Sequence, residues 1–161
     1  MAPPERGPPG EGAVDYALVL GSNAAPARGL RLAGRRIAER FDVIACTPAM
    51  RTRDEAGGRY LNAAMRIRTA LAFDALRAAL HAIEDEAGRV RGSARVALDI
   101  DIVAAQDARG ALLVFKPGDV ARGFVRALLA RVGFVPVVAQ GTGEAFAPQS
   151  KNPRGSDLGR E

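Results

Sequence analysis

Two aspartates, Asp99 and Asp101, stand two residues apart in the apolar stretch RVALDIDIVAA (95–105). Residues i and i+2 of a β-strand point to the same face, so we expect the two carboxylates to lie side by side. Desolvated carboxylates repel each other, and Mg²⁺ is the cation that such a pair typically shares with substrate phosphates. The alternative is a solvated strand face that binds nothing, and the D-x-D spacing alone favours that alternative.

A pair of arginines precedes the aspartates. Arg89 and Arg91 lie in the segment GRVR, where their guanidinium groups could contact the phosphates that a metal ion holds. The net charge of +5 comes almost wholly from arginine, because only Lys116 and Lys151 are lysines. Arginine suits phosphate, which favours a nucleotide or nucleic acid as partner. The alternative is that arginine abundance, like that of alanine and glycine, reflects genomic base composition.

Length and composition indicate one ordinary globular unit. A chain of 161 residues with 48% hydrophobic content can bury a single core, so we expect one domain over residues 15–146. The flanking segments 1–14 and 147–161 are rich in proline, glycine and polar residues and are expected to be disordered tails.

Several classes of protein are disfavoured. No stretch approaches the roughly 18 to 20 apolar residues of a membrane span, and the N-terminus lacks an apolar signal region, so we expect a cytoplasmic protein. The lone Cys46 and lone His81 offer no zinc cluster. We expect Cys46 to be a small buried hydrophobe and His81 to be a surface residue.

Hydrophobic periodicity predicts the elements that position the aspartates. The predicted strands are 15–23, 41–48, 60–69, 95–105 and 110–115, the predicted helices are 27–40, 71–88 and 118–132, and 49–59 is expected to be a polar loop. This order predicts an α+β protein with a ferredoxin-like βαββαβ sandwich, a mostly antiparallel sheet with helices packed on one face, plus an additional C-terminal helix and strand.

The motifs LGSN, CTP, YLNAA, GRVR and LDIDI occur in this order along the chain. With them the chain resembles the 6-hydroxymethyl-7,8-dihydropterin pyrophosphokinase family over roughly residues 16–138. The resemblance implies a diphosphokinase of folate or related pterin biosynthesis, which transfers pyrophosphate from ATP to the pterin hydroxymethyl group and releases AMP. It implies a monomer whose partners are small molecules, with neither a membrane nor nucleic acid among them.

The resemblance also implies roles for individual residues. It assigns two Mg²⁺ ions to Asp99 and Asp101, and catalytic roles to these aspartates and to Arg89 and Arg91. The implied pterin-binding residues are Thr47, Pro48, Met50, Tyr60, Asn62 and Phe124. The implied nucleotide-binding residues are Glu84, Arg89, Arg91, Ile102, Lys116 and Arg122.

Some of these residues have simpler interpretations. Tyr60 and Phe124 could be core aromatics, and Asn62 could face solvent. Thr47 and Pro48 could merely end a strand. Glu84 could form a surface ion pair with Arg77 or Arg89.

The chain departs from the family pattern on the triphosphate side. Only GSARVAL separates GRVR from the aspartates, where the family carries a longer lid of the form R-W-G-P-R-T, and the chain has no tryptophan. Val96 stands where the family arginine would align, with Arg95 one position away, and Lys116 replaces a histidine. The sequence therefore predicts either an ATP- and Mg²⁺-dependent pterin pyrophosphokinase, including one acting on a modified pterin, or a pterin-binding paralogue with weak or no transfer.

An RNA-binding module is a third interpretation, suggested by the expected sheet and the basic charge. Aromatic residues make up only 5% of the chain, and the central strands lack the aromatics that would stack on bases. This composition disfavours the RNA-binding interpretation.

Overall fold

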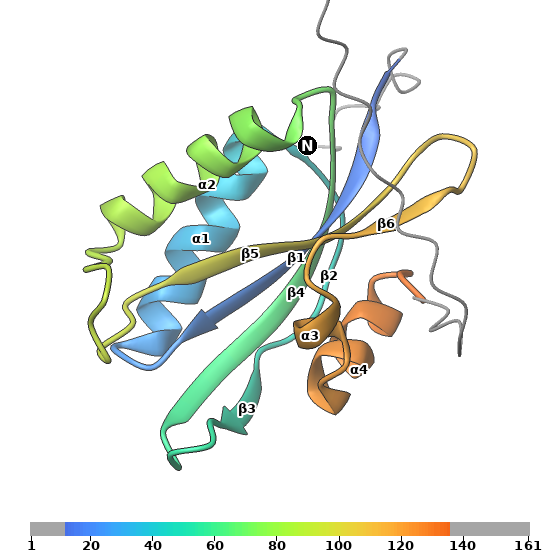
Figure 1. Cartoon of the computed structure of the whole chain (residues 1–161). Helices are drawn as coiled ribbons and strands as arrows, with labels where there is room; N and C mark the ends of the chain where they lie inside the picture. Colours follow the sequence, from blue (N-terminus) through green and yellow to red (C-terminus); the bar gives the residue numbers. More distant parts are fainter. Residues whose placement is uncertain (1–11, 136–161) are drawn as a thin grey trace, which may run out of the picture.

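The computed structural model describes residues 12–135, which form one mixed α+β unit (Figure 1). The elements in chain order are β1 (Val14–Ser22), α1 (Pro26–Arg40), β2 (Asp42–Cys46), β3 (Met50–Arg53), β4 (Arg59–Thr69), α2 (Phe73–Glu86), β5 (Asp99–Gln106), β6 (Leu112–Val114), α3 (Pro117–Val120) and α4 (Gly123–Arg131). The strand order is β2-β4-β1-β5-β6, with β3 also paired to β4, and every pairing is antiparallel. The predicted ferredoxin-like α+β arrangement is confirmed.

Two apolar clusters cover the two faces of the sheet. On one face α1 and α2 bury a stripe that includes Ile37, Leu76 and Leu80 against the strands. On the opposite face α3 and α4 bury Val120, Val125 and Leu128. In Figure 1, α1 and α2 lie on one side of the sheet, at the left, and α3 and α4 lie on the other side, at the lower right. The C-terminal helices therefore correct the expectation of helices on one face, and they enclose the face on which the aspartates lie.

Two predicted segments differ from the structure. The expected polar loop 49–59 contains β3, whose register places Arg51 opposite Leu61 and Thr52 opposite Tyr60 in β4. This segment is polar, so burial of apolar side chains does not explain its conformation. The backbone hydrogen bonds with β4 hold it as a strand. The expected helix 118–132 is two helices, because Arg122 adopts an extended backbone just before Gly123.

The predicted tails lie almost wholly outside the described residues. Residues 1–11 and 136–161 are not described, while Val14 already belongs to β1. Within the described part of the chain, no helix has the length and apolar character to cross a membrane.

The single histidine and the single cysteine of the chain are both exposed. His81 is exposed, as predicted. The prediction for Cys46 is wrong, because this residue is exposed. It ends β2, which among the described strands pairs with β4.

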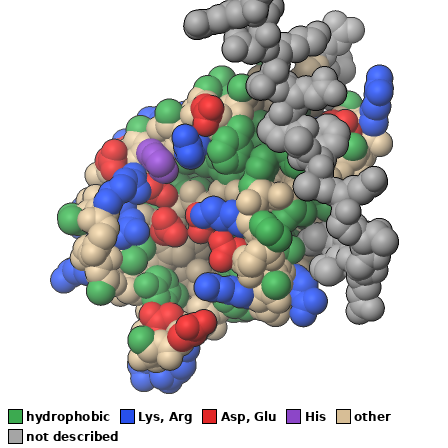
Figure 2. All heavy atoms as spheres, viewed as in Figure 1, with side chains coloured by type: hydrophobic (Ala, Val, Ile, Leu, Met, Phe, Trp, Pro, Cys, Tyr) green, Lys and Arg blue, Asp and Glu red, His purple; other side chains and the backbone are tan. Residues whose placement is uncertain are grey.

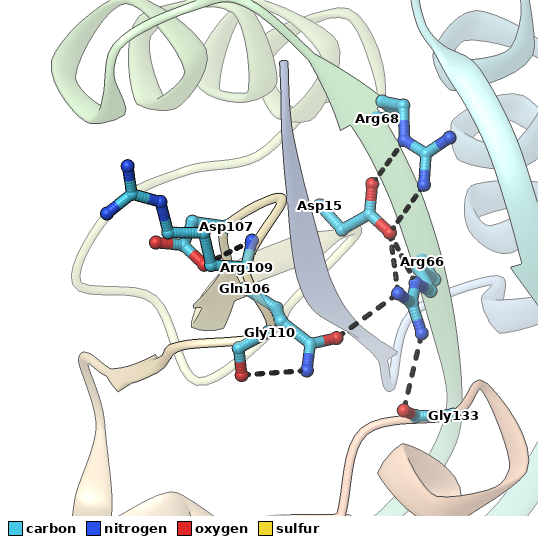
Figure 3. A network of polar contacts seen from close by, with 8 residues as sticks. All are labelled: Asp15, Arg66, Arg68, Gln106, Asp107, Arg109, Gly110 and Gly133. Carbon is cyan, nitrogen blue, oxygen red and sulfur yellow. Dashed lines mark hydrogen bonds and ion pairs between the residues drawn. The ribbon is translucent and has the colours of Figure 1, made fainter. Parts of the chain in front are cut away.

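A buried ion-pair network joins β1, β4 and the end of α4 (Figure 3). Asp15 is 5% exposed, and its carboxylate accepts hydrogen bonds from Arg66 and Arg68 at 2.6 Å each. Arg66 also donates to the carbonyl of Gly133 at 3.3 Å, and its guanidinium lies 4.9 Å from the ring centre of Phe134. This network ties the C-terminal part of the described chain to the sheet, at the end of β1 far from Gly21.

Candidate functional site

The side chains of Asp99 and Asp101 line a cavity of about 250 Å³ on the face covered by α3 and α4. Sheet register explains their position. Asp99 lies opposite Gly21, and Asp101 lies opposite Val19, so both project from β5 on the same side as these residues of β1. In the space-filling view of this face, acidic and basic side chains lie side by side near its centre (Figure 2). The structure therefore places both carboxylates on one wall of the same cavity.

An amide and two aromatic side chains also line this cavity. They are Asn62, Tyr60 and Phe124, which come from β4 and α4. Asn62 is 7% exposed, and its Nδ2 donates a hydrogen bond of 2.5 Å to Thr52 Oγ1. Because Thr52 takes one donor of the amide, the Asn62 side chain is held in a fixed orientation. The cavity thus combines flat apolar surfaces with an oriented donor and acceptor.

The electrostatics of the cavity favour a cation. Burial, then the charges of Asp101 and Glu84, raise the pKa of Asp99 above its usual value, against the opposing charges of Arg89 and Lys116. The largest cause is burial, and the smaller contributions of Asp101 and Glu84 show that two other carboxylates lie close enough to repel the Asp99 charge. Within residues 12–135, no cluster of three or more Asp, Glu, His or Cys side chains is arranged to hold a metal ion. A divalent ion here would therefore need oxygen ligands from a bound substrate or water in addition to the aspartates.

Glu84 connects the aspartate strand to the arginine segment. The side chain is 1% exposed, and its carboxylate accepts hydrogen bonds from the N–H of Ile100 at 2.7 Å and from Arg91 at 2.8 Å. Ile100 stands between the two aspartates, so Glu84 fixes β5 where they emerge. The interpretation of Glu84 as a surface ion pair is wrong. The nucleotide contact of Glu84 stays a prediction; each of its carboxylate oxygens already accepts a hydrogen bond within the protein.

The two arginines of GRVR differ in their surroundings. Arg91 is held by Glu84, and also by Asp85 at 3.2 Å. Arg89 has a buried Nε for which the described residues provide no hydrogen-bond partner. Burial without a partner is costly for a charged group, so Arg89 has unused capacity for an anion.

The remaining predicted residues are distributed around the cavity. Arg122 lines it, and Lys116 contacts Asp101 without being part of the lining. Ile102 packs in the core on the α1 and α2 face, so its side chain is turned away from the aspartates, and its nucleotide contact stays a prediction. The predicted residues outside the lining are Thr47, Pro48, Met50, Glu84, Arg89, Arg91, Ile102 and Lys116.

Thr47 and Met50 have identifiable structural contacts. The Thr47 hydroxyl accepts a hydrogen bond from the N–H of Ala64 at 3.0 Å, which joins the end of β2 to β4. Met50 pairs with Asn62 in the β3–β4 ladder and packs against the core beneath α3 and α4. Neither residue lines the cavity.

Sequence reasoning missed several lining residues. Gly21, Thr52 and Asp119 line the cavity together with Val96. Gly21 belongs to the LGSN motif, but its role depends on its cross-strand neighbour. A Cβ at this position would lie 2.9 Å from Asn62 Oδ1, so glycine leaves the space that the amide occupies. Asp119 lies in the first turn of α3, where it makes no side-chain cap.

Replacing Gly21 with alanine is expected to weaken binding of the pterin that the sequence resemblance implies about tenfold, because the new methyl group displaces the oriented Asn62 amide. Fluorescence titration with the dihydropterin would measure this loss. Gly34→Ala is the matched control, since a Cβ at Gly34 meets no atom within 4 Å. Equal pterin affinity in both variants would show that the Asn62 position does not matter for binding.

The sheet and the cavity together define a ferredoxin-like α+β domain with an acidic cavity on one face. The sequence profile of the family described as 7,8-dihydro-6-hydroxymethylpterin-pyrophosphokinase (HPPK) matches residues 17–133. That range is more than half of the 161-residue chain, and the chain belongs to this family.

Other comparisons add little. Comparison with curated proteins gives no significant match. Among solved structures, one similar chain is described as "Crystal Structure of an Unknown Protein from Galdieria sulphuraria", with 14% identity and a TM-score of 0.41. The match covers 60% of this chain and 52% of that one, so the chain spans about half the length of that structure.

Proposed function

We propose that this protein transfers pyrophosphate from ATP to the hydroxymethyl group of 6-hydroxymethyl-7,8-dihydropterin, with release of AMP. The observation that carries the proposal is a single cavity that joins Asp99 and Asp101 to Asn62, Tyr60 and Phe124, in a chain of the HPPK family. Its volume of about 250 Å³ suits one bicyclic ring system better than a pterin together with ATP. The triphosphate would therefore lie at the aspartate end of the cavity and toward the GRVR segment.

The residues fit Mg²⁺ and a nucleotide. Two carboxylates on one strand face, both lining the same cavity, supply the hard oxygen donors that Mg²⁺ prefers. The charge of Arg89 acts on Asp99, so its guanidinium group would lie close to phosphates held at the aspartates. In this proposal Asp99 and Asp101 would hold the metal, which would neutralise phosphate charge and lower the pKa of the substrate hydroxyl.

The chain's own residues contribute mainly positioning. Asn62 would bind the polar edge of the pterin, and Tyr60 and Phe124 would pack on its ring. Arg89 and Arg91 would orient the phosphates for in-line attack. The hydroxymethyl oxygen forms a bond to the β-phosphorus, the bond from that phosphorus to the α–β bridging oxygen breaks, AMP leaves with that oxygen, and the hydroxyl proton passes to solvent.

A direct test combines ligand binding with product detection. The full chain would be titrated with the dihydropterin and a non-hydrolysable ATP analogue by calorimetry, and AMP release would be followed with ATP and Mg²⁺. Binding of both ligands with AMP formation that requires both Mg²⁺ and pterin supports the proposal. Absence of pterin binding would contradict it.

A second candidate function is pterin binding without efficient transfer. One observation favours it: Val96, which the resemblance places at an arginine position, lines the cavity, whereas Arg95 lines a separate hollow beside the start of α1. The cavity wall is therefore apolar where the family pattern would supply a guanidinium group. Pterin binding with no AMP formed would select this candidate.

Introducing the missing arginine should separate the two candidates. Val96→Arg is expected to raise affinity for the ATP analogue about tenfold, because a guanidinium at a cavity wall forms a charge-assisted contact with phosphate. Leu113→Arg is the matched control, since Leu113 is 50% exposed in β6 and absent from the cavity lining. Calorimetry would measure both. An equal gain in the control would attribute the effect to overall charge.

A further inference from the structure

Lys116 forms an ion pair with one of the two aspartates. Its ammonium group contacts Asp101 Oδ1, with the lysine side chain 44% exposed and the aspartate side chain 30% exposed. Burial opposes the charged form, but the hydrogen bond from Lys116 to Asp101 and the charges of Asp101, Asp119 and Asp99 raise the lysine pKa above its usual value. The lysine is therefore a charged group held in the acidic region.

The backbone around Lys116 is anchored, which leaves the side chain as the movable part. Lys116 precedes α3, and its carbonyl accepts a hydrogen bond from Val120 at 3.0 Å. The preceding Phe115 donates its N–H to Val103 at 2.9 Å, and its ring lies 4.6 Å from that of Phe73. With a fixed backbone and a flexible four-carbon stem, the ammonium can leave Asp101 without any change in the fold.

The ammonium and a divalent ion would compete for the same carboxylate oxygen. An ammonium at ion-pair distance from Asp101 repels a second cation and reduces the negative charge available to it. It uses one of its three donors on Asp101, so it also has capacity for other anions. A phosphate arriving with a metal would offer such an anion.

We propose that Lys116 is a tethered cation that occupies the aspartate pair in the absence of nucleotide and moves to a phosphate oxygen when the metal and nucleotide enter together. This inference rests on the proposed function and adds a regulation of its site. Under this scheme metal binds the free protein weakly, because the Lys116 ammonium competes for Asp101. Metal and nucleotide strengthen each other's binding, because the metal displaces the ammonium from Asp101 and a phosphate of the nucleotide accepts it. Lys116 acts as a positioning residue that couples the two ligands.

The test measures binding of Mn²⁺, used as a paramagnetic probe, to the full chain without nucleotide. Lys116→Met is expected to bind Mn²⁺ at least about tenfold more tightly than the wild type, because the competing charge is gone. Lys116→Arg, which keeps the charge, is expected to stay within about threefold of the wild type. Lys116→Gln provides a second neutral variant, and circular dichroism would verify that each variant is folded.

A second experiment measures how strongly the nucleotide analogue changes the affinity for Mn²⁺. Adding a non-hydrolysable ATP analogue is expected to raise Mn²⁺ affinity about tenfold more in the wild type than in Lys116→Met, since the variant has no ammonium to transfer. Arg109→Met, in the turn at the other end of β5, is the charge-matched control and should behave like the wild type.

The outcomes separate this inference from the proposed function. Equal Mn²⁺ affinity in the wild type and both neutral variants, with normal tightening by nucleotide, would overturn the role of Lys116 and leave the pyrophosphokinase proposal standing. If no variant binds Mn²⁺ with or without the analogue, the metal role of the aspartates fails, and the inference fails with it. A gain of the same size in Arg109→Met would also overturn the inference, because it would reflect net charge alone.

Discussion

Asparagine in place of Asp99 is expected to lower kcat for AMP release on the order of 10³-fold while leaving pterin affinity nearly unchanged. The substitution keeps the shape of the side chain and removes the charge that would hold the metal ion. The pterin contacts proposed for Asn62, Tyr60 and Phe124 come from other elements, so the apolar end of the cavity is preserved. Steady-state kinetics at saturating Mg²⁺, with calorimetry for pterin binding, would measure both effects.

The control for this result is Asp74→Asn. Asp74 has a side chain that is 85% exposed on α2 and forms an ion pair with Arg77, so its loss should not affect transfer. Asp101→Asn is expected to reduce kcat similarly, although it also frees Lys116 from its ion pair. If Asp99→Asn turned over at the wild-type rate, the aspartates would not be the metal ligands and the proposed mechanism would be wrong.

Local patterns predicted the elements that carry the cavity. The period of two in LDIDI placed both aspartates on one strand face, and the apolar spacing around Leu76, Leu80 and Ile83 predicted α2 within a few residues of its observed bounds. These predictions succeeded because strand and helix periodicities are local properties that burial of one face enforces. The strand order followed from the βαββαβ sequence of elements.

Features that depend on distant partners could not be predicted. The burial of Glu84 arises from the N–H of Ile100 in another element, which a helical pattern cannot show. The strand β3 is polar, and its pairing with β4 decides its conformation. Gly21 and Thr52 likewise acquire their roles through cross-strand contact with Asn62. The one signal available in the sequence was Gly123, which marks the break between α3 and α4.

The second large expected effect concerns stability. Asp15→Asn is expected to lower the free energy of unfolding by about 3 kcal/mol, because it leaves Arg66 and Arg68 close together without their shared counter-ion. The Arg66 and Arg68 side chains are 20% and 33% exposed, so water can solvate part of their uncompensated charge. The expected loss of stability is therefore at the lower end of the range for breaking a buried ion pair. Urea denaturation at neutral pH would measure the change, and Asp74→Asn should show almost none.

The pH dependence of stability gives an independent check on the same network (Figure 3). Burial alone would raise the pKa of Asp15, but the hydrogen bonds and charges of Arg68 and Arg66 outweigh it and hold the pKa below the usual value. A carboxyl group with a lowered pKa in the folded state stabilises the fold above its unfolded pKa, and this contribution is lost as the pH falls below about 4 toward the folded pKa. The wild type should therefore lose its advantage over Asp15→Asn in this acidic range. A difference in unfolding free energy that stayed constant from pH 7 to the acid limit of folding would contradict the assignment of the stabilisation to the ionised carboxylate.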